Sequence, residues 1–284
     1  MLNMGYLYHY TNYDALKYIL PGRSVLEKRG IKNKDTEFRF TRYDFLNDCN
    51  EGEILYEYLK KQRENICKRL KEKMGNDFSE QQFDEYVENS KLFDSFIEEK
   101  YSKCFAFCVS RLRDSSQFWL SPYANEENGG GICLCFDSYR VGKEIEDYIV
   151  KCVKENEFLY QSVVDYVNPY EINCGDIISD VFLNKLELII RNRAVITDNF
   201  CVKYAGWKTE QEFRWLYWPR PQSIQYDNDD KQTPRARLYF NDITDEIILG
   251  PSFKESDIKN VRKELESRGY RQIKISLSKV QLRR

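Results

Sequence analysis

Two glutamates and an arginine alternate in the segment TEQEFRW, in the last third of the chain. Glu210, Glu212 and Arg214 are spaced by two residues. Because successive side chains of a strand point to opposite faces, a strand here places the three charged groups on one face. Two carboxylates beside a guanidinium can do acid–base or electrostatic chemistry. The pattern alone favours an exposed edge strand with a Glu–Arg pair.

The single histidine of the 284 residues lies in the segment LYHYT. Alternation in a strand puts His9 and Thr11 on one face and the neighbouring tyrosines on the other. An imidazole can serve as a base, a metal ligand or a hydrogen-bonding group for a substrate. A lone histidine, however, is more often a core residue whose hydrogen bonds are satisfied within the protein.

An aromatic pair follows in SSQFWLSPYA. Trp119 and Tyr123 are four residues apart and share a face if the segment is helical. Such a pair is more often part of a core than a platform for a ligand. Gly129–Gly131 precede a strand instead of a helix, which favours a tight turn over a phosphate-binding loop.

A metal site is not predicted. Nine cysteines occur without a CxxC pair, and only one histidine accompanies them, so reduced and buried cysteines fit better than zinc ligands. Asn47, Asp48 and Glu51 lack the ligand spacing of a calcium loop and are expected to cap a helix.

Composition limits the function classes. The formal net charge is −2, so the chain lacks the overall positive charge that is typical of proteins that bind nucleic acids or membranes. No apolar run approaches the roughly 20 residues that cross a bilayer, and the N-terminus lacks signal-peptide features. The sequence is therefore expected to be cytoplasmic, without membrane contact.

Strand-like and helix-like segments are interleaved without a strict βαβ rhythm, which predicts a mixed-sheet α+β fold. The region at about 52–101 is charged with helical spacing and is interrupted at Gly75–Asp77, so we expect a helical hairpin inserted there. Helices are also expected near 141–154, 176–193 and 255–266, and a solvated loop at 225–235. No linker divides the chain, which predicts a single domain over residues 1–284.

Six segments, taken in order, carry a family resemblance: LYHYT, FLNDCNE, CFAFCVSRLRDSSQFWLSPYA, GGGICLCFD, GWKTEQEFRW and DEIILG. From about Tyr6 to Ser278 the chain resembles the bacterial family catalogued as domain of unknown function 2971. That family is in turn remotely similar to the ADP-ribosyltransferase superfamily. The resemblance implies a mixed or antiparallel split β-sheet core of the ADP-ribosyltransferase type, with the helical hairpin as an insertion.

The resemblance also assigns site residues, position by position. His9 matches the first-strand histidine of the superfamily, and Glu212 matches its late-strand glutamate. Glu210 stands two residues earlier, as in Glu-x-Glu variants. Tyr123, or else Trp119, matches the aromatic residue that follows a strand-and-serine stretch.

The serine of that stretch is Ser110, which would line the site. Thr11 would assist His9 in binding the adenosine ribose. Arg42 and Arg214 are the candidates for the pyrophosphate, because a guanidinium fork matches phosphate oxygens.

These assignments imply chemistry on NAD as substrate, with no metal. Cleavage of the nicotinamide–ribose bond passes through an oxocarbenium-like state, which a fixed carboxylate such as Glu212 stabilises. Glu210 would orient or deprotonate the acceptor. The resemblance implies an ADP-ribosyltransferase or NAD glycohydrolase acting on a macromolecular acceptor, protein or nucleic acid.

The same resemblance implies a toxin or an anti-phage defence effector, with an antitoxin or a defence-system protein as partner. The alternative is a non-catalytic module that uses the same fold to bind a nucleotide, a nucleic acid or a protein. A shared cleft for His9, an aromatic ring and Glu212 is what distinguishes the enzyme from the binding module.

Overall fold

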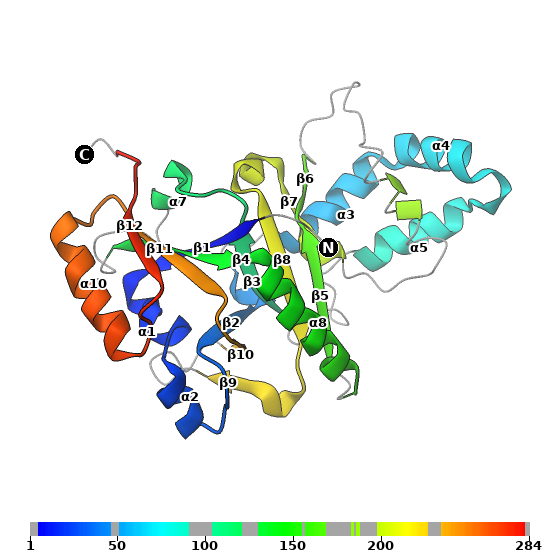
Figure 1. Cartoon of the computed structure of the whole chain (residues 1–284). Coiled ribbons are helices and arrows are strands. Elements are labelled where there is room, and N and C mark those ends of the chain that lie inside the picture. The colour runs from blue at the N-terminus through cyan, green and yellow to red at the C-terminus, as the bar shows by residue number, and fades with distance from the viewer. Residues whose placement is uncertain are drawn as a thin grey trace. The chain divides into compact units, whose positions relative to one another are not determined.

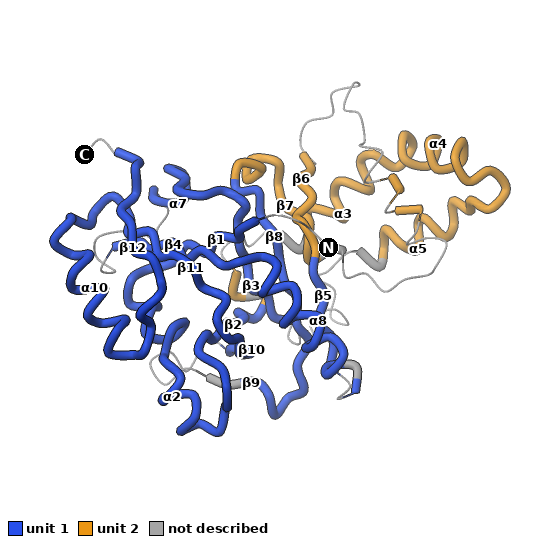
Figure 2. The backbone as a smooth tube through the Cα atoms, viewed as in Figure 1, with its two compact units in different colours: residues 1–42, 105–161, 210–284 blue, residues 43–104, 162–209 orange. Residues whose placement is uncertain are grey.

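The computed structural model of the chain describes residues 5–46, 51–90, 104–120, 130–154, 157–168, 183–184, 186–187, 198–226 and 234–281 (Figure 1). These residues form two compact units, each built from separate stretches of sequence (Figure 2). Unit 1 comprises residues 1–42, 105–161 and 210–284, and unit 2 comprises residues 43–104 and 162–209.

Unit 1 is organised on a mostly antiparallel sheet. Among the described residues the strand order is β12-β11-β4-β1-β3-β2-β10-β9, with β8 pairing with β3 and β5. The strands are β1 Tyr6–Asn12, β2 Thr36–Arg42, β3 Phe105–Ser110, β4 Gly131–Asp137, β5 Phe158–Val163, β8 Glu212–Trp218, β9 Ile224–Tyr226, β10 Pro234–Phe240, β11 Thr244–Leu249 and β12 Lys274–Leu277.

Strand β3 has three partners. It pairs along its length with β8, with β1 at Ser110, and with β2 at Phe105 and Ala106. Strands β1 and β2 therefore meet β3 at its two ends. The fold class predicted from the sequence, α+β with a mixed and mostly antiparallel sheet, is confirmed at this level.

One face of the sheet is aromatic. The Phe38 ring is fully buried and lies 4.1 Å from Phe107, 4.3 Å from Phe240 and 4.9 Å from Phe136, measured between ring centroids. Alternation along each strand collects these rings on one side, where each removes a large apolar area from water. We call this side, which also carries Trp215, the Phe107 face.

Helices of unit 1 are α1 Leu16–Ile19, α2 Arg23–Lys28, α7 Ser116–Trp119, α8 Ser138–Lys154 and α10 Glu255–Ser267. The predicted helices at 141–154 and 255–266 are confirmed. Tyr148 of α8 packs its ring 5.6 Å from Phe240 and exchanges hydrogen bonds with the Tyr239 backbone. Helix α10 connects β11 to β12, which lie parallel, as a helical crossover allows.

Unit 2 contains the predicted helical region. It forms three helices, α3 Glu51–Lys61, α4 Arg63–Met74 and α5 Glu80–Ser90, with the predicted break at Gly75–Asp77. Leu59, Leu70 and Phe83 are fully buried in its core. Short strands β6 Asp165–Val167 and β7 Val202–Tyr204 pair in parallel. Residues 91–103, and most of the helix expected at 176–193, lie outside the described residues.

The segment expected as a loop at 225–235 is partly strand. Strand β9 ends at Tyr226 and β10 begins at Pro234, and the two pair antiparallel. Pro234 is the first residue of β10. Proline has no N–H to donate to a ladder, and the first residue of a strand is one of the few positions in a sheet where it is tolerated. The intervening residues 227–233 lie outside the described part of the chain.

Candidate functional site

Three strands that carry the sequence motifs are neighbours in the sheet. Strand β3 lies beside both β1 and β8, although these segments are about a hundred residues apart in sequence. Tyr8 of β1 is directly opposite Ser110 of β3, which is directly opposite Glu212 of β8. Directly opposed residues share a sheet face. These three side chains therefore define one face, which we call the Glu212 face.

Glu212 and Arg214 form a buried bidentate ion pair on this face. Arg214 Nε donates to Glu212 Oε1 at 2.6 Å and a terminal nitrogen donates to Oε2 at 3.0 Å. Glu212 is 6% exposed and Arg214 is 1% exposed. The expectation of an exposed edge strand is wrong, because β8 pairs with strands on both sides. Burial makes the pairing obligatory, since an isolated buried charge is costly.

Glu210 does not belong to the strand. It ends a 3₁₀ turn, Ala205–Glu210, and Gln211 has a positive φ of 45°, so β8 begins only at Glu212. The expected face of three alternating charges is therefore reduced to two. The Glu210 carbonyl oxygen accepts a hydrogen bond of 2.6 Å from the Ser110 hydroxyl.

Ser110 joins the segments around Glu212. Besides donating to Glu210, its hydroxyl oxygen accepts a 2.9 Å hydrogen bond from the Leu112 backbone N–H. The side chain is buried, with 2% of the residue exposed. Ser110 thus fixes the end of β3 against the start of β8. It was identified from the sequence as a site residue, and it does lie beside Glu212 in the ladder.

His9 lies on the opposite face of the sheet. Its neighbour Tyr8 is aligned with Glu212, so His9 alternates to the Phe107 face, and its ring stacks on Phe107 at 4.5 Å. Thr11 has the same parity as His9. The expectation that His9 and Glu212 share a cleft is not met in this structure, because strand alternation and ladder register separate them.

The His9 imidazole has a clear structural role. Its Nδ1 lies 2.9 Å from the carbonyl oxygen of Cys108. A carbonyl only accepts, so Nδ1–H is the donor and fixes the tautomer. Burial lowers the pKa of His9 to about 4, against a smaller opposing effect of the Cys108 hydrogen bond. The ring is therefore neutral near pH 7. Its hydrogen bond joins β1 to Cys108 of β3, which lies between the residues of β3 that pair with β1 and those that pair with β2.

Trp119 is a core residue, as its pattern favoured. It is 3% exposed, lies edge-on to the Tyr10 ring at 5.0 Å and donates from Nε1 to Asp114 at 2.8 Å. Its surroundings include Tyr8 and Ile248. It belongs to the layer covering the Glu212 face of β1 and β4. Tyr123, the alternative aromatic, lies outside the described residues, as do Asn47 and Asp48.

Arg42 is the last residue of β2 and pairs with Phe105 of β3. Phe105 has the same parity as Phe107, so Arg42 lies on the Phe107 face, whereas Arg214, opposite Cys108, lies on the Glu212 face. The two predicted pyrophosphate ligands are therefore not brought together. Gly130 has a φ of 89°, and a Cβ there would meet the Phe253 and Ser252 side chains at 2.7 Å. Steric crowding accounts for this glycine without a phosphate.

A second buried carboxylate on the Glu212 face was missed from the sequence. Glu246 of β11 is opposite Cys135 of β4, which is opposite Tyr8. It is 7% exposed and contacts Arg113 and Lys274. Its segment, DEIILG, was part of the family resemblance, but only the ladder register shows that Glu246 belongs to the same row as Ser110.

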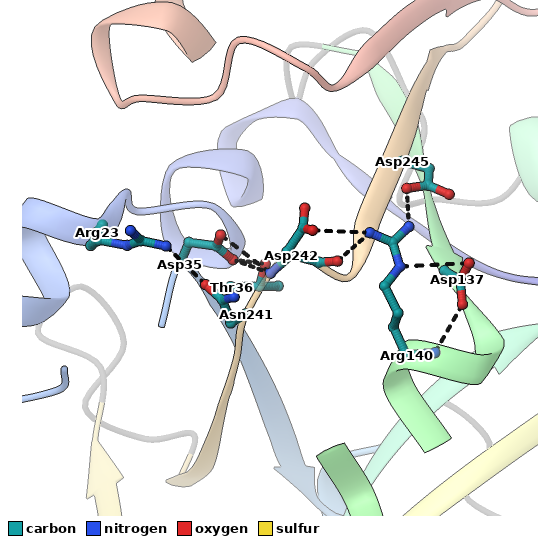
Figure 3. A network of polar contacts seen from close by, with 8 residues as sticks. All are labelled: Arg23, Asp35, Thr36, Asp137, Arg140, Asn241, Asp242 and Asp245. Atoms are coloured by element: carbon teal, nitrogen blue, oxygen red, sulfur yellow. Dashed lines mark hydrogen bonds and ion pairs between the residues drawn. The ribbon is translucent and has the colours of Figure 1, made fainter. Parts of the chain in front are cut away.

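Carboxylates gather at the turn between β10 and β11 (Figure 3). Arg140 of α8 forms ion pairs with Asp137, Asp242 and Asp245. Asp35 accepts hydrogen bonds from the Asp242 backbone at 3.2 and 3.3 Å. A single guanidinium thus ties the start of a helix to a turn, which is a structural arrangement. No group of histidine, cysteine and acidic residues suited to a metal occurs among the described residues.

No disulfide bond joins any of the cysteines in the described ranges. Cys104, Cys133 and Cys135 are buried and Cys108 is partly exposed. Burial raises the pKa of Cys133 well above its ordinary value, so its thiol is a poor nucleophile near neutral pH. These residues act as small apolar side chains in the strands, as the composition favoured.

Comparisons of the chain with protein-family models, with curated proteins and with solved structures find no match. Among the described residues, no helix is both long enough and apolar enough to span a membrane.

Proposed function

We propose that this protein cleaves the nicotinamide–ribose bond of NAD and transfers ADP-ribose to a macromolecular acceptor, or to water, at the Glu212 face. One observation carries the proposal: the strands β1, β3 and β8, which hold the motif residues, are adjacent, and Ser110 and Glu212 are paired in one ladder. The family resemblance of the sequence supports the same chemistry.

Glu212 is the residue to which we assign the main chemical role. Loss of nicotinamide takes the bonding electron pair with the leaving group and leaves positive charge at ribose C1′. A buried carboxylate stabilises that charge and accepts a hydrogen bond from the ribose 2′-hydroxyl. Its bidentate bond to Arg214 holds the carboxylate in one orientation, which is the purpose of support around a reactive group.

The remaining roles follow from position. Glu210 precedes β8, and its backbone carbonyl accepts the Ser110 hydrogen bond. We assign to its carboxylate the proton that the acceptor hydroxyl or water loses as it bonds to C1′. Tyr123 remains the proposed ring for stacking on nicotinamide, because Trp119 is committed to the core. His9, Thr11 and Arg42 are removed from the proposed site, since they lie on the other face.

The test is direct incubation of the purified chain with NAD labelled in the adenosine part, with and without cell lysate. The proposal predicts release of free nicotinamide and, with lysate, label in protein or nucleic acid. The class of labelled macromolecule identifies the acceptor. Absence of both nicotinamide and label would exclude the enzyme.

A second function has its own supporting observation. His9 and Glu212 lie on opposite faces, which is the arrangement expected of the binding module and not of the enzyme. Arg214 also neutralises the Glu212 carboxylate, which favours a module that binds a nucleotide without reacting. Calorimetric titration with NAD distinguishes the two candidates. Binding without release of nicotinamide favours the module, whereas binding with turnover favours the enzyme.

A further inference from the structure

The row of opposed side chains that contains Glu212 continues across the sheet. In order from β8 to β12 its members are Glu212, Ser110, Tyr8, Cys135, Glu246 and Lys274. Strands lie about 4.8 Å apart, so Glu212 and Glu246 are separated by about 19 Å along the row. Glu212 and Glu246 are both buried, and each is bonded to an arginine.

Glu246 collects more positive charge than it carries negative charge. One terminal nitrogen of Arg113 lies 3.0 and 2.9 Å from its two oxygens, and Lys274 Nζ lies 3.2 Å from Oε1. The Ser276 hydroxyl also donates to Oε1, at 2.7 Å. Two cations on one carboxylate leave a net charge of +1 at this position.

The side chains of Arg113 and Lys274 are exposed to solvent, whereas that of Glu246 is buried. The side chain of Arg113 is 50% exposed and that of Lys274 is 65% exposed, against 9% for Glu246. Arg113 reaches Glu246 through Nη2 alone, so its Nε and Nη1 donors have no bond to any residue in the described part of the chain. These donors are available to an anion from solvent.

The backbone that carries Arg113 is fixed on both sides. The Tyr10 hydroxyl donates to the Leu112 carbonyl at 2.7 Å and accepts from the Ser115 N–H at 3.0 Å. Asp114 accepts from the Trp119 ring and from the Lys279 backbone N–H, at 2.8 and 2.7 Å. Such anchoring lowers the entropy that binding a ligand must remove.

We propose that Arg113 and Lys274, oriented by Glu246, form a phosphate-binding subsite on the Glu212 face. The inference extends the proposed function, because it assigns the phosphate contacts of that face. Arg214 is poorly placed for them, since it is 1% exposed and bound to Glu212. A half-exposed guanidinium with free N–H donors matches phosphate geometry, and lysine adds a compact charge.

The phosphate has two sources that share this chemistry. It belongs either to the dinucleotide substrate or to the backbone of a nucleic-acid acceptor.

The first test measures binding of inorganic pyrophosphate to the full chain at low ionic strength, by NMR titration. Arg113→Gln is expected to weaken binding about tenfold and Lys274→Gln severalfold. Arg111→Gln is the matched control, because it removes an exposed arginine two residues away and should leave the affinity unchanged. Unchanged binding in Arg113→Gln, or an equal loss in Arg111→Gln, overturns the subsite.

The second test identifies the source with the same variants, whose melting temperatures are checked first. A loss of NAD affinity in Arg113→Gln with oligonucleotide binding retained assigns the subsite to the dinucleotide, and the reverse assigns it to the acceptor. If the wild type cleaves no NAD but its pyrophosphate binding depends on Arg113, the proposed function fails and the subsite stands. If the wild type cleaves NAD, and Arg113→Gln binds pyrophosphate, NAD and the oligonucleotide as tightly as the wild type does, the subsite is excluded and the proposed function stands.

Discussion

At the scale of single residues, the imidazole of His9 serves the sheet. It hydrogen-bonds Cys108 on β3, between the points where β3 pairs with β1 and with β2, and it stacks on Phe107. Burial disfavours the charged imidazolium, which is why the pKa of His9 is lowered to about 4. A positive charge on His9 would have to be accommodated beside an aromatic core.

This placement predicts a pH effect on stability. Between pH 6.5 and about 4 the unfolded chain binds a proton at His9 and the folded chain does not, so the free energy of unfolding falls as pH falls. The loss approaches roughly 3 kcal/mol at the lower end of this window. Urea denaturation at several pH values measures it, and His9→Gln should remove this part of the slope.

Because His9 is the only histidine, NMR reports on it without ambiguity. Its ring resonances should remain those of a neutral imidazole down to about pH 4. A titration midpoint between 6 and 7 would show an exposed ring and contradict the structural role.

The buried pair of β8 gives a second prediction. Arg214→Gln leaves Glu212 buried without its guanidinium and should lower the free energy of unfolding by roughly 3–5 kcal/mol. The double variant Glu212→Gln/Arg214→Gln should recover a large part of that loss, because no charge stays buried. Chemical denaturation measures both, and additive losses in the double variant would show that the two side chains are not coupled.

At the scale of elements, the sequence correctly predicted two long helices of unit 1 and the strand that carries His9. Helices α8 and α10 were evident from their apolar spacing, and the break at Gly75–Asp77 from its turn-forming residues. The predicted beginning of β8 was wrong by three residues, because Gln211 adopts a positive φ that an alternation pattern does not reveal.

Ladder register explains why the site was only partly predicted. The sequence correctly placed Glu212 and Arg214 on one face, since alternation within a strand is local. Whether His9 faces the same way depends on how β1 aligns with β3, and a shift of one residue reverses the answer. The same dependence on register explains why Glu246 was not predicted as a member of this face.

The β10–β11 turn supplies a prediction at this scale. Arg140→Gln leaves Asp137, Asp242 and Asp245 close together without a cation, and stability should fall by roughly 1–2 kcal/mol because the group is partly exposed. Thermal denaturation measures it, with Lys143→Gln on the same helix as a control. The loss should shrink at high salt, and a loss equal to that of the control would show that the turn does not depend on Arg140.

At the scale of the whole molecule, the described residues fall into two compact units, and the single domain expected over residues 1–284 stays a prediction. Helices α3, α4 and α5 belong to the second unit, together with residues 162–209. No sequence pattern within residues 43–104 or 162–209 indicates that the two stretches pack together. Their association follows from shared burial, as with Leu70 and Val202 in one core, which periodicity along the chain does not predict.

The proposed activity also belongs to the whole molecule, since β1, β3 and β8 come from three separate stretches of unit 1. A pair of variants isolates the central assignment. Glu212→Gln removes the carboxylate charge while keeping hydrogen-bonding groups for Arg214, and Glu266→Gln removes an exposed glutamate from α10. Melting temperatures establish that both variants are folded at the assay temperature.

Release of nicotinamide from NAD by the wild type and these two variants is the most direct measurement. The expected result is release by the wild type and by Glu266→Gln, and a loss of at least a hundredfold in folded Glu212→Gln, because that variant lacks the main electrostatic group. Equal release by folded Glu212→Gln, or no release by the wild type, would contradict it.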